Sequence, residues 1–378
     1  MAVQWTPQQR EVIDSEGCNL LVSAAAGSGK TAVLVERIIQ RLTREENPAD
    51  ISRLLVVTFT RAAAAKMRER IGKGIDKKME ENPGSRHLQH QKLILQAAQI
   101  STIHSLCKTL IQENFETLEI DPSFRMGEEN ELKILQQDVV SDMLEGYYAS
   151  GNQQFRNFVD RYAGKRADEG IAQLILDTYK FSRGCAAPDF WLDSCVEMFS
   201  GSDGTGRVSL EVQITELAKK TLASAVGLLQ QGMSLIQSEN GPQRYEPMLS
   251  SDLEQLSPLL EETDYERMRN GILAYSPMRM AVIRGGVDEE KKKLVKQLRD
   301  QVKDKVSSFA RDFLRESRDE LLEETEYLRP CICMLTELVK EFSRRFAAEK
   351  TERGMMDFSD LEHETLRLLA VFSKDENG

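Results

Sequence analysis

The sequence is poor in proline, in aromatic residues and in long apolar runs. Proline accounts for only 10 of 378 residues, about half of the roughly 5% in average proteins, and aromatic residues make up 6%. This composition leans towards helix. The hydrophobic share of 40% is ordinary for a globular chain and excludes wholesale disorder, collagen and a coiled-coil rod. At about 150 residues per domain, the length favours two or three domains.

Paired cysteines and membrane signals are also missing. The six cysteines are Cys18, Cys107, Cys185, Cys195, Cys331 and Cys333. None forms a Cys-x-x-Cys pair or stands at metal-ligand spacing from a histidine, so we expect packing roles. The polar first ten residues are not a secretory signal, and no apolar run reaches the roughly 18 residues that span a bilayer. The sequence therefore predicts a reduced, cytoplasmic protein without a membrane partner.

Charge is present in excess but is unevenly distributed. The 50 Lys and Arg residues against 61 Asp and Glu give a net charge of −11, which taken alone argues against a nucleic-acid binder. Residues 1–120, however, contain 16 basic and 14 acidic residues, a net of +2. The remainder contains 34 and 47, a net of −13. This asymmetry indicates that the two regions have different roles.

Short apolar runs alternate with helical patterns over the first 120 residues. The predicted strands are 19–23, 54–58 and 98–103, and the predicted helices are 31–42, 61–78 and 104–115. Strands that alternate with helices imply right-handed crossovers and a parallel sheet. The sequence therefore predicts an α/β fold for this region.

From residue 128 to about 348 the pattern is helical and almost without strand signal. Glycine and proline mark breaks at 186–188, 201–206, 241–242 and 285–286, of which 201–206 is the best candidate for a flexible loop. We therefore expect one largely helical domain here. Residues 354–378 carry a different pattern, which is considered below.

The strongest motif follows the first predicted strand. It reads Ala24-Ala25-Ala26-Gly27-Ser28-Gly29-Lys30-Thr31 and fits the Walker A pattern with alanine at its first glycine position. Small residues let backbone N–H groups close around phosphate oxygens, and the helix that begins here adds its positive end. Lys30 would supply charge to the phosphates and the Thr31 hydroxyl a ligand to Mg²⁺. Gln9, about 20 residues upstream, has an amide suited to adenine.

Polar and aromatic residues follow the other two predicted strands. Thr58-Phe59-Thr60-Arg61 comes directly after one strand, and Ser101–Ser105 ends the other. Side chains at the carboxyl ends of parallel strands face the ligand crevice. Hydroxyls and an arginine suit phosphate contacts, and an aromatic ring can stack on a base. The helix over 61–78 carries seven basic and two acidic residues, which favours contact with DNA.

Taken in order, these motifs resemble superfamily 1A DNA helicases of the UvrD/RecB type. The match is most specific to the AddA (RexA) family of ATP-dependent helicase/nuclease subunits. The segments that carry it are 24–37, 53–71, 100–107, 121–125 (DPSFR) and 356–362 (MDFSDLE). Arg61 stands where this superfamily commonly has asparagine. The helical middle matches mainly in placement.

The resemblance implies a P-loop, RecA-like parallel sheet with a large helical insertion. Residues 1–120 would be the first part of RecA-like domain 1A, residues 121–350 the 1B insertion, and residues 351–378 the return to 1A. The implied cofactors are ATP and Mg²⁺, with Lys30 and Thr31 as the catalytic residues and Thr31 as the metal ligand. The predicted nucleotide site comprises Gln9, Ala24, Ala25, Ala26, Gly27, Ser28, Gly29, Lys30, Thr31 and Arg37. The predicted DNA contacts are Thr58, Phe59, Thr60, Arg61, Thr102, His104 and Ser105.

The resemblance also implies a function and partners. The chain would be the ATP-binding part of a helicase with exonuclease activity that translocates on single-stranded DNA and unwinds duplex DNA during recombinational repair of double-strand breaks. Its partner would be the second helicase/nuclease polypeptide, AddB or RexB, in a heterodimer. Two alternatives remain open: a UvrD-type helicase without nuclease, or a P-loop switch or adaptor that binds nucleotide and protein. The acidic helical middle favours the adaptor, because it should repel a phosphate backbone.

The last segment leads to a further expectation. In the family, the motif at 356–362 precedes the acidic Walker B strand, and no acid pair after an apolar strand follows here. Asp375-Glu376 stands in a polar tail, so we do not assign it that role. The sequence therefore predicts an amino-terminal fragment of a longer protein, inactive in ATP hydrolysis by itself, with an exposed sheet edge and apolar face.

Overall fold

The computed structural model describes residues 4–25, 27–44, 46–162, 167–199, 209–283 and 285–370. Ala26, the predicted loop 201–206 and Asp375-Glu376 lie outside these ranges. The described chain divides into two compact units. The first contains residues 4–128 and 350–370, and the second contains residues 129–349.

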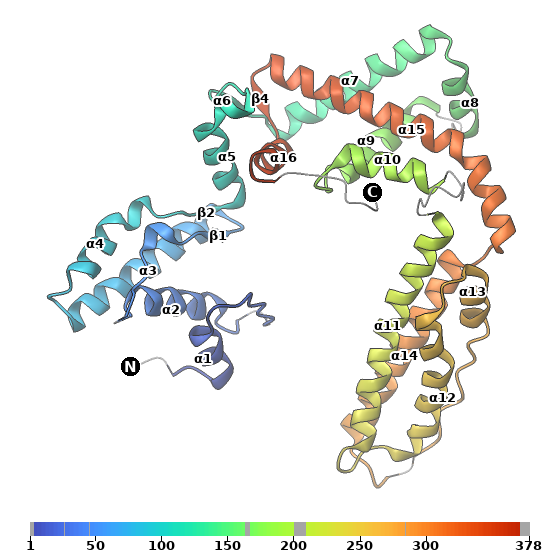
Figure 1. Cartoon of the computed structure of the whole chain (residues 1–378), viewed down its shortest axis with the longest axis horizontal. Helices are drawn as coiled ribbons and strands as arrows, with labels where there is room; N and C mark the ends of the chain where they lie inside the picture. The colour runs from blue at the N-terminus through green and yellow to red at the C-terminus, as the bar shows by residue number, and fades with distance from the viewer. Residues whose placement is uncertain are drawn as a thin grey trace. The chain divides into compact units, whose positions relative to one another are not determined.

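The first unit combines helices with two small parallel sheets (Figure 1). Its helices are α1 (Pro7–Asp14), α2 (Lys30–Leu42), α3 (Arg61–Glu81), α4 (Arg86–Ile94), α5 (Ile103–Glu113), α6 (Phe115–Leu118) and α16 (Phe358–Leu369). Two 3-10 turns are η1 (Ile51–Arg53) and η2 (Leu95–Ala97). Its strands are β1 (Val56–Thr58), β2 (Ile100–Thr102), β3 (Arg125–Met126) and β4 (Met355–Met356). A mostly helical chain with small parallel sheets is compatible with the predicted α/β class.

Two of the three predicted strands form, and the first does not. β1 and β2 pair in parallel with Val56 opposite Ile100, as the patterns at 54–58 and 98–103 predict. The strand predicted at 19–23 is wrong, because the described backbone there makes no ladder hydrogen bonds and Leu21 is 97% exposed. An apolar run is not sufficient for a strand when no neighbouring strand completes its hydrogen bonds. The sequence analysis also missed the short pair β3–β4.

The first unit has two hydrophobic clusters. In one, α2 and α3 pack with β1 and β2 around Leu42, Ile71, Ile75 and Ile100. The other joins α5, α6 and α16 through buried Ile111, Leu118 and Leu361. Each cluster follows the apolar stripe of its helices, and the first of them includes Val56 of β1 and Ile100 of β2.

β3 and β4 pair two segments of the first unit that are far apart in sequence. Gly127 N–H donates to the Met356 carbonyl at 2.9 Å, and Arg125 N–H donates to the Gly354 carbonyl at 3.0 Å. Nearby, Lys350 is buried and its Nζ contacts Asp357 Oδ2 at 2.7 Å and Asp360 Oδ2 at 2.5 Å. The two carboxylates also form the capping box of α16. This end of the unit is therefore tied by backbone pairing and a buried ion cluster.

The described residues of the second unit contain helices and the segments that connect them, and no strand (Figure 1). Its helices are α7 (Glu129–Ser150), α8 (Gln153–Tyr162), α9 (Ala167–Ser182), α10 (Pro188–Met198), α11 (Leu210–Gln237), α12 (Glu246–Leu256), α13 (Tyr265–Leu273), α14 (Glu289–Phe313) and most of α15 (Arg318–Glu352). The 3-10 turn η3 (Gln243–Tyr245) lies between α11 and α12, and η4 (Ser257–Glu261) lies between α12 and α13. The breaks predicted at 186–188, 241–242 and 285–286 are confirmed. Among all described helices, none is long and apolar enough to cross a membrane.

A bundle of α11, α12, α13 and α14 encloses a charged pair. Arg299 on α14 and Asp252 on α12 are both fully buried, and the guanidinium contacts the carboxylate through Nε at 2.6 Å and Nη2 at 2.9 Å. Arg299 Nη1 also donates to the Met278 carbonyl at 2.8 Å. Burial of both ions is tolerated because each is hydrogen-bonded to its partner.

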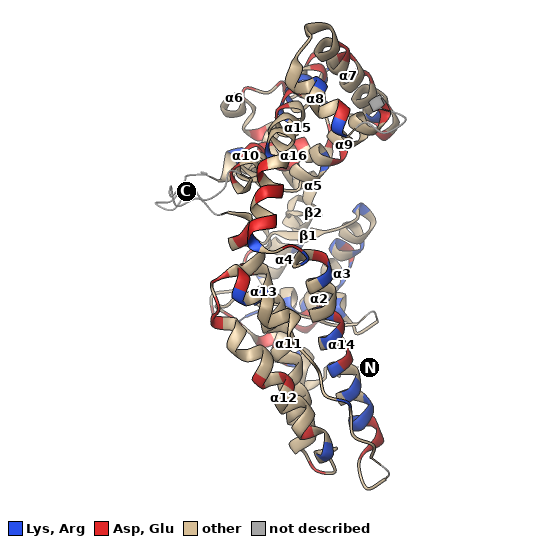
Figure 2. Cartoon of the chain, turned by 90° about the vertical axis from the view of Figure 1, so that its right-hand side faces the viewer, with Lys and Arg blue, Asp and Glu red and all other residues tan. Residues whose placement is uncertain are grey.

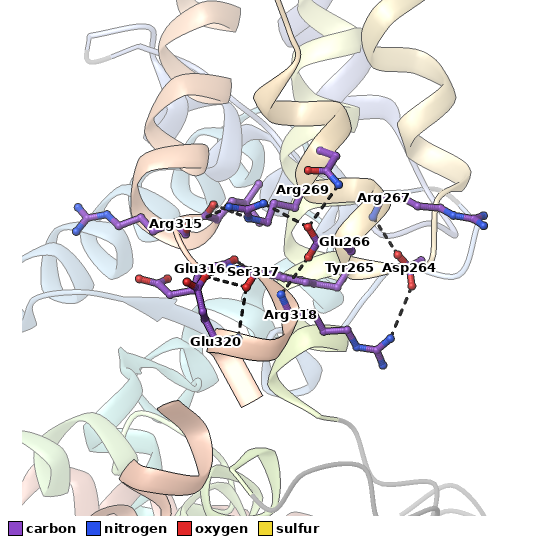
Figure 3. A network of polar contacts seen from close by, with 12 residues as sticks. Asp264, Tyr265, Glu266, Arg267, Arg269, Arg315, Glu316, Ser317, Arg318 and Glu320 are labelled. Atoms are coloured by element: carbon purple, nitrogen blue, oxygen red, sulfur yellow. Dashed lines mark hydrogen bonds and ion pairs between the residues drawn. The ribbon is translucent and has the colours of Figure 1, made fainter. Parts of the chain in front are cut away.

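A polar network fixes the turn between α14 and α15 (Figure 3). Arg269 on α13 donates to the carbonyls of Leu314 and Arg315 at 3.2 and 3.1 Å. The Arg318 guanidinium contacts both carboxylate oxygens of Glu211, at 2.8 and 3.0 Å. The turn is thus held by side chains from α11 and α13.

The lysine-rich part of α14 is a mixed-charge surface rather than a basic one. Figure 2 shows basic and acidic residues side by side along this helix. Lys292 pairs with Glu289 at 2.9 Å, Lys303 pairs with Asp300 at 3.3 Å, and Lys291 donates to the Glu239 carbonyl at 2.7 Å. Part of its positive charge is therefore balanced within the helix itself.

Candidate functional site

The phosphate-loop sequence forms a glycine turn that ends at the start of α2. Gly27 and Gly29 have φ angles of 81° and 84°, in the left-handed region that residues with a Cβ rarely adopt. Gly29 is the N-cap of α2, so the first backbone N–H groups of a 13-residue helix point into the loop. Such a helix end attracts anions through its N–H groups and its dipole. The local structure therefore fits a phosphate group.

Gln9 lies against this loop, although it is 19 residues away in sequence. Its Nε2 donates to the Ser28 carbonyl at 3.1 Å, and its Oε1 accepts from Thr6 N–H at 3.0 Å. The second contact is half of the capping box that begins α1. A Cβ on Gly29 would lie 3.3 Å from Gln9 Nε2, a tight contact that adds to the preference for glycine set by the left-handed φ of this residue.

Lys30 and Thr31 begin α2 and are both exposed. Lys30 Nζ turns back over the loop, donating to the Ala25 carbonyl at 2.9 Å and also contacting the Ala24 carbonyl. Thr31 stands in the first turn, where its hydroxyl is accessible. The loop and helix start therefore present the Lys30 ammonium group and the Thr31 hydroxyl to the solvent.

A cavity of about 550 Å³ lies between α1 and the loop. Gln9, Ser28, Lys30 and Arg37 line it, together with apolar side chains such as Leu34. The Arg37 guanidinium contacts the Val12 and Ile13 carbonyls at the end of α1, which anchors α1 to α2. Of the predicted nucleotide site, the structure thus places Gln9, Ala24, Ser28, Lys30 and Arg37 around one cavity. Ala25, Gly27, Gly29 and Thr31 belong to the adjoining loop and helix start without lining it, and Ala26 lies outside the described residues.

The fit to a nucleoside triphosphate with Mg²⁺ can be judged from these groups. The glycine turn and helix end suit the phosphates, and Lys30 adds a cation within the loop. Thr31 offers the hydroxyl ligand that Mg²⁺ accepts. Gln9 provides a polar contact for a base, and the apolar side chains that line the cavity, such as Leu34, provide a nonpolar one. The residues present therefore fit ATP and Mg²⁺.

The predicted DNA residues lie at the carboxyl ends of β1 and β2. In the sheet, Thr58 pairs with Thr102, so both strands end at one edge. The Thr58 hydroxyl donates to the Thr60 carbonyl at 3.0 Å, and the Thr60 hydroxyl caps α3 by accepting from Ala63 N–H at 3.1 Å. These two threonines therefore shape the turn that presents Phe59, whose side chain is fully exposed.

Thr102 and Ser105 have a similar local role at the start of α5. Thr102 is only 9% exposed, and its hydroxyl accepts from Ser105 N–H at 3.2 Å and contacts the Ser105 hydroxyl at 2.8 Å. Thr102 is therefore placed to orient the first turn of α5 rather than to present its own side chain.

His104 is in contact with two residues of α16. Its Nε2 lies 3.1 Å from Glu362 Oε1, and its ring centre lies 4.7 Å from that of Phe358. Sequence reasoning assigned no role to Phe358 or Glu362. Both residues lie in the segment 356–362, whose motif indicates a position before Walker B but not its neighbours in the fold.

Some basic side chains of α3 form ion pairs or hydrogen bonds with the described chain, and others do not. Lys73 pairs with Glu69 and Lys78 with Glu81, and Arg68 donates to the Ala98 and Ile100 carbonyls. The Lys73 hydrogen bond lowers the pKa of Glu69, which therefore stays ionised. The basic residues of α3 without a hydrogen bond or ion pair to the described chain are Arg61, Lys66, Arg70 and Lys77. Arg61 is the one adjacent to Phe59.

The chain belongs to the UvrD/REP helicase family: the model of the UvrD/REP helicase N-terminal domain matches residues 5–377. Over 99% of its length it is 39% identical to the A component of the ATP-dependent helicase/nuclease of Lachnoclostridium phytofermentans. It is 38% identical to the protein of that name from Geobacillus thermodenitrificans and 37% identical to that from Clostridium acetobutylicum, over 98% and 99% of its length. The chain spans 28%, 30% and 31% of these three relatives.

Proposed function

We propose that the chain is the ATP-binding amino-terminal part of an ATP-dependent DNA helicase/nuclease subunit. In the whole protein it would translocate on single-stranded DNA and unwind duplex DNA, in recombinational repair of double-strand breaks. The observation that carries the proposal is the glycine turn at the start of α2, with Gln9 hydrogen-bonded to it. Membership of the helicase family favours a protein that acts on DNA over a P-loop switch that binds protein.

The nucleotide would be held by residues that line the cavity, among them Gln9 and Lys30, and by the loop and Thr31 beside it. The loop N–H groups and Lys30 would bind the phosphates, the Thr31 hydroxyl would bind Mg²⁺, and Gln9 would read adenine. Arg37 would flank the base or ribose, although its contacts with the end of α1 also give it a structural role. Hydrolysis of bound ATP supplies the free energy for movement along DNA. To receive the phosphates, the Lys30 ammonium would exchange its loop carbonyls for phosphate oxygens.

Single-stranded DNA would lie across the shared edge of β1 and β2. Phe59 offers a fully exposed ring for stacking, and Arg61 offers a cation for phosphate beside it. Thr58, Thr60, Thr102 and Ser105 would act mainly by shaping the two turns. His104 would add a ring from α5.

We further propose that the first unit is the RecA-like domain 1A with its P-loop, and that the second is the 1B insertion. The relatives are each named as one lettered component of a helicase/nuclease, which implies a second polypeptide. We propose the helicase/nuclease polypeptide AddB or RexB as the partner in a heterodimer of the whole protein.

Two titrations test the proposal on this chain. A fluorescent N-methylanthraniloyl-ATP should bind in the presence of Mg²⁺ and be displaced by unlabelled ATP. A fluorescein-labelled single-stranded oligonucleotide should bind by fluorescence polarisation at low salt. Nucleotide binding without DNA binding would favour the switch or adaptor, and absence of both would refute the proposal.

A further inference from the structure

We propose that Cys333 is a site of reversible modification by the disulfide of a small, carboxylate-bearing thiol. It lies in the second unit, in a cavity of about 460 Å³ between α8 and α15. Two arginines, Arg161 and Arg329, and two cysteines, Cys331 and Cys333, line this cavity. The inference does not depend on the proposed function, because none of these residues belongs to the nucleotide or DNA sites.

Cys333 is the thiol of the cavity that a reagent can reach. It is partly exposed, whereas Cys331 is buried with only 3% of its surface accessible. Arg329 precedes Cys333 by four residues on α15, so the two side chains lie on the same face of the helix. Reactive cysteines in proteins occupy partly exposed, electropositive surroundings of this kind.

The two guanidinium groups are available to an anionic ligand. Arg161 Nη1 donates to the Tyr327 carbonyl at 3.0 Å and to Cys331 Sγ at 3.5 Å, and the guanidinium carbon lies 4.3 Å from the centre of the Tyr327 ring. These contacts orient Arg161 and leave its Nε and Nη2 without a hydrogen bond to the described chain. Arg329 is exposed and makes no hydrogen bond or ion pair to the described chain. Guanidinium groups bind carboxylates through paired hydrogen bonds, so the cavity suits a ligand that carries carboxylates.

The rest of the lining suits the body of a short peptide. Buried Phe158 and Met334 provide apolar contacts, and Gln154 on α8 adds an amide that can both donate and accept. Among the described residues that line the cavity, Glu337 is the one acid, and its carboxylate accepts from the Tyr147 hydroxyl at 3.1 Å. Two cations against one anion favour an anionic ligand. The volume is within the range of small-molecule sites.

The reaction is a thiol–disulfide exchange. The Cys333 thiol releases its proton to water, and the thiolate attacks one sulfur of the small disulfide. A sulfur–sulfur bond to the protein forms, the bond within the reagent breaks, and the other half leaves as a thiolate that takes up a proton. Cys333 is oxidised and the departing half is reduced, so no further oxidant is needed. The small thiol in excess reverses the step, which makes the modification responsive to the ratio of thiol to disulfide.

The test compares an anionic disulfide, glutathione disulfide, with a cationic one, cystamine. Mass spectrometry of proteolytic peptides gives the rate of modification at each cysteine of the folded chain. With glutathione disulfide, Cys333 should react faster than Cys185 and Cys195, which are also partly exposed but do not line the cavity. Added salt should slow this reaction, because it screens the attraction between the reagent and the arginines. Faster modification of Cys185 or Cys195 would overturn the proposal.

Replacement of Arg329 separates attraction of the ligand from a structural effect. Arg329→Gln should slow modification of Cys333 by glutathione disulfide about 5-fold, the effect of one charge pair in water. The rate with cystamine should not fall, because that reagent is repelled by the arginine. Arg329→Lys should retain most of the rate with glutathione disulfide. The matched control is Arg156→Gln, which removes an exposed arginine of α8 that does not line the cavity and should change neither rate. Equal rates for Arg329→Gln and the unsubstituted chain, or equal slowing with both reagents, would overturn the proposal.

Discussion

Two neighbouring residues of the phosphate loop meet different requirements. Gly29 supplies a backbone conformation, and Lys30 supplies a positive charge. Gly29 has a left-handed backbone, ends the loop and leaves room for the Gln9 amide. Lys30 follows it and turns its ammonium back onto loop carbonyls. The types and spacing of these residues were predictable from the Walker A pattern. The contact of Gln9 with the Ser28 carbonyl was not, because no local rule joins residues so far apart in sequence.

Replacement of Lys30 tests the chemical requirement. Lys30→Ala removes the loop cation and should weaken nucleotide binding roughly 10- to 100-fold, the effect of losing a charged hydrogen bond. Titration with N-methylanthraniloyl-ATP measures it. Lys77→Ala, an exposed lysine on α3, is the control and should bind normally. Unchanged binding by Lys30→Ala would remove the loop from the nucleotide site.

Replacement of Gly29 tests the conformational requirement. Gly29→Ala puts a Cβ on a residue with φ 84° and near Gln9 Nε2, and should lower the free energy of unfolding by about 1–2 kcal/mol. Urea denaturation followed by circular dichroism measures the loss. Gly84→Ala is the matched control, because an added Cβ there meets nothing within 4 Å and no left-handed φ is involved. Equal stability of the two variants would contradict the argument.

At the scale of elements, helices were easier to predict than strands. α2, α3 and α5 follow local apolar periodicity, so their positions could be read from the sequence. The segment 19–23 is apolar, but a strand depends on a neighbour that local sequence does not specify. The pairing of β3 with β4 was missed for the same reason: two residues carry no periodic signal. The contact between α16 and His104 likewise depends on packing between distant segments.

The buried ion pair between Arg299 of α14 and Asp252 of α12 should have a measurable effect on the free energy of unfolding. Arg299→Met leaves the Asp252 carboxylate buried without its partner and should lower the free energy of unfolding by about 3–5 kcal/mol. In the double variant Asp252→Leu and Arg299→Met, most of that loss should be recovered, because neither charge remains. Urea unfolding of the three variants measures both effects. A double variant less stable than either single one would show that the pair contributes more than mutual neutralisation.

α15 should contribute stability that depends on pH. Arg344 and Arg345 hydrogen-bond to Glu341 and lower the pKa of its carboxyl from 4.5 to about 2. A carboxyl with a lowered pKa in the folded state stabilises fully above its unfolded value and loses this contribution as pH falls towards 2. Glu341→Gln should therefore melt below the unmodified chain at neutral pH, with the gap closing between about pH 4.5 and pH 2. A gap independent of pH would contradict the assignment.

For the whole molecule, the distribution of charge matters more than its sum. The whole chain has a net charge of −11, but residues 1–120 have a net charge of +2. In this region Arg61 stands beside the fully exposed Phe59. In the second unit, Lys292 and Lys303 of α14 are paired with neighbouring carboxylates, and Lys291 donates to a carbonyl. An acidic protein can therefore offer a local surface to DNA.

Salt dependence should locate that surface. The affinity for single-stranded DNA should fall steeply with salt, because bound counterions are released from the phosphates. Arg61→Ala should weaken binding and reduce the slope of log affinity against log salt by about one. Lys305→Ala, an exposed lysine on α14, is the control and should leave the slope unchanged. The reverse result would place the DNA on the second unit.

The pairing of β3 with β4 has a consequence for how the chain tolerates change. Gly127 donates to Met356, so the polypeptide departs from and returns to one point of the first unit. The entropy of closing such a loop grows only with the logarithm of its length, at about 0.6 kcal/mol per doubling. Lengthening a flexible loop within the intervening segment is therefore nearly neutral for the first unit. The junction at β3 and β4 accordingly sets one requirement on whatever lies between them, which is that its two ends return close enough for the strands to pair.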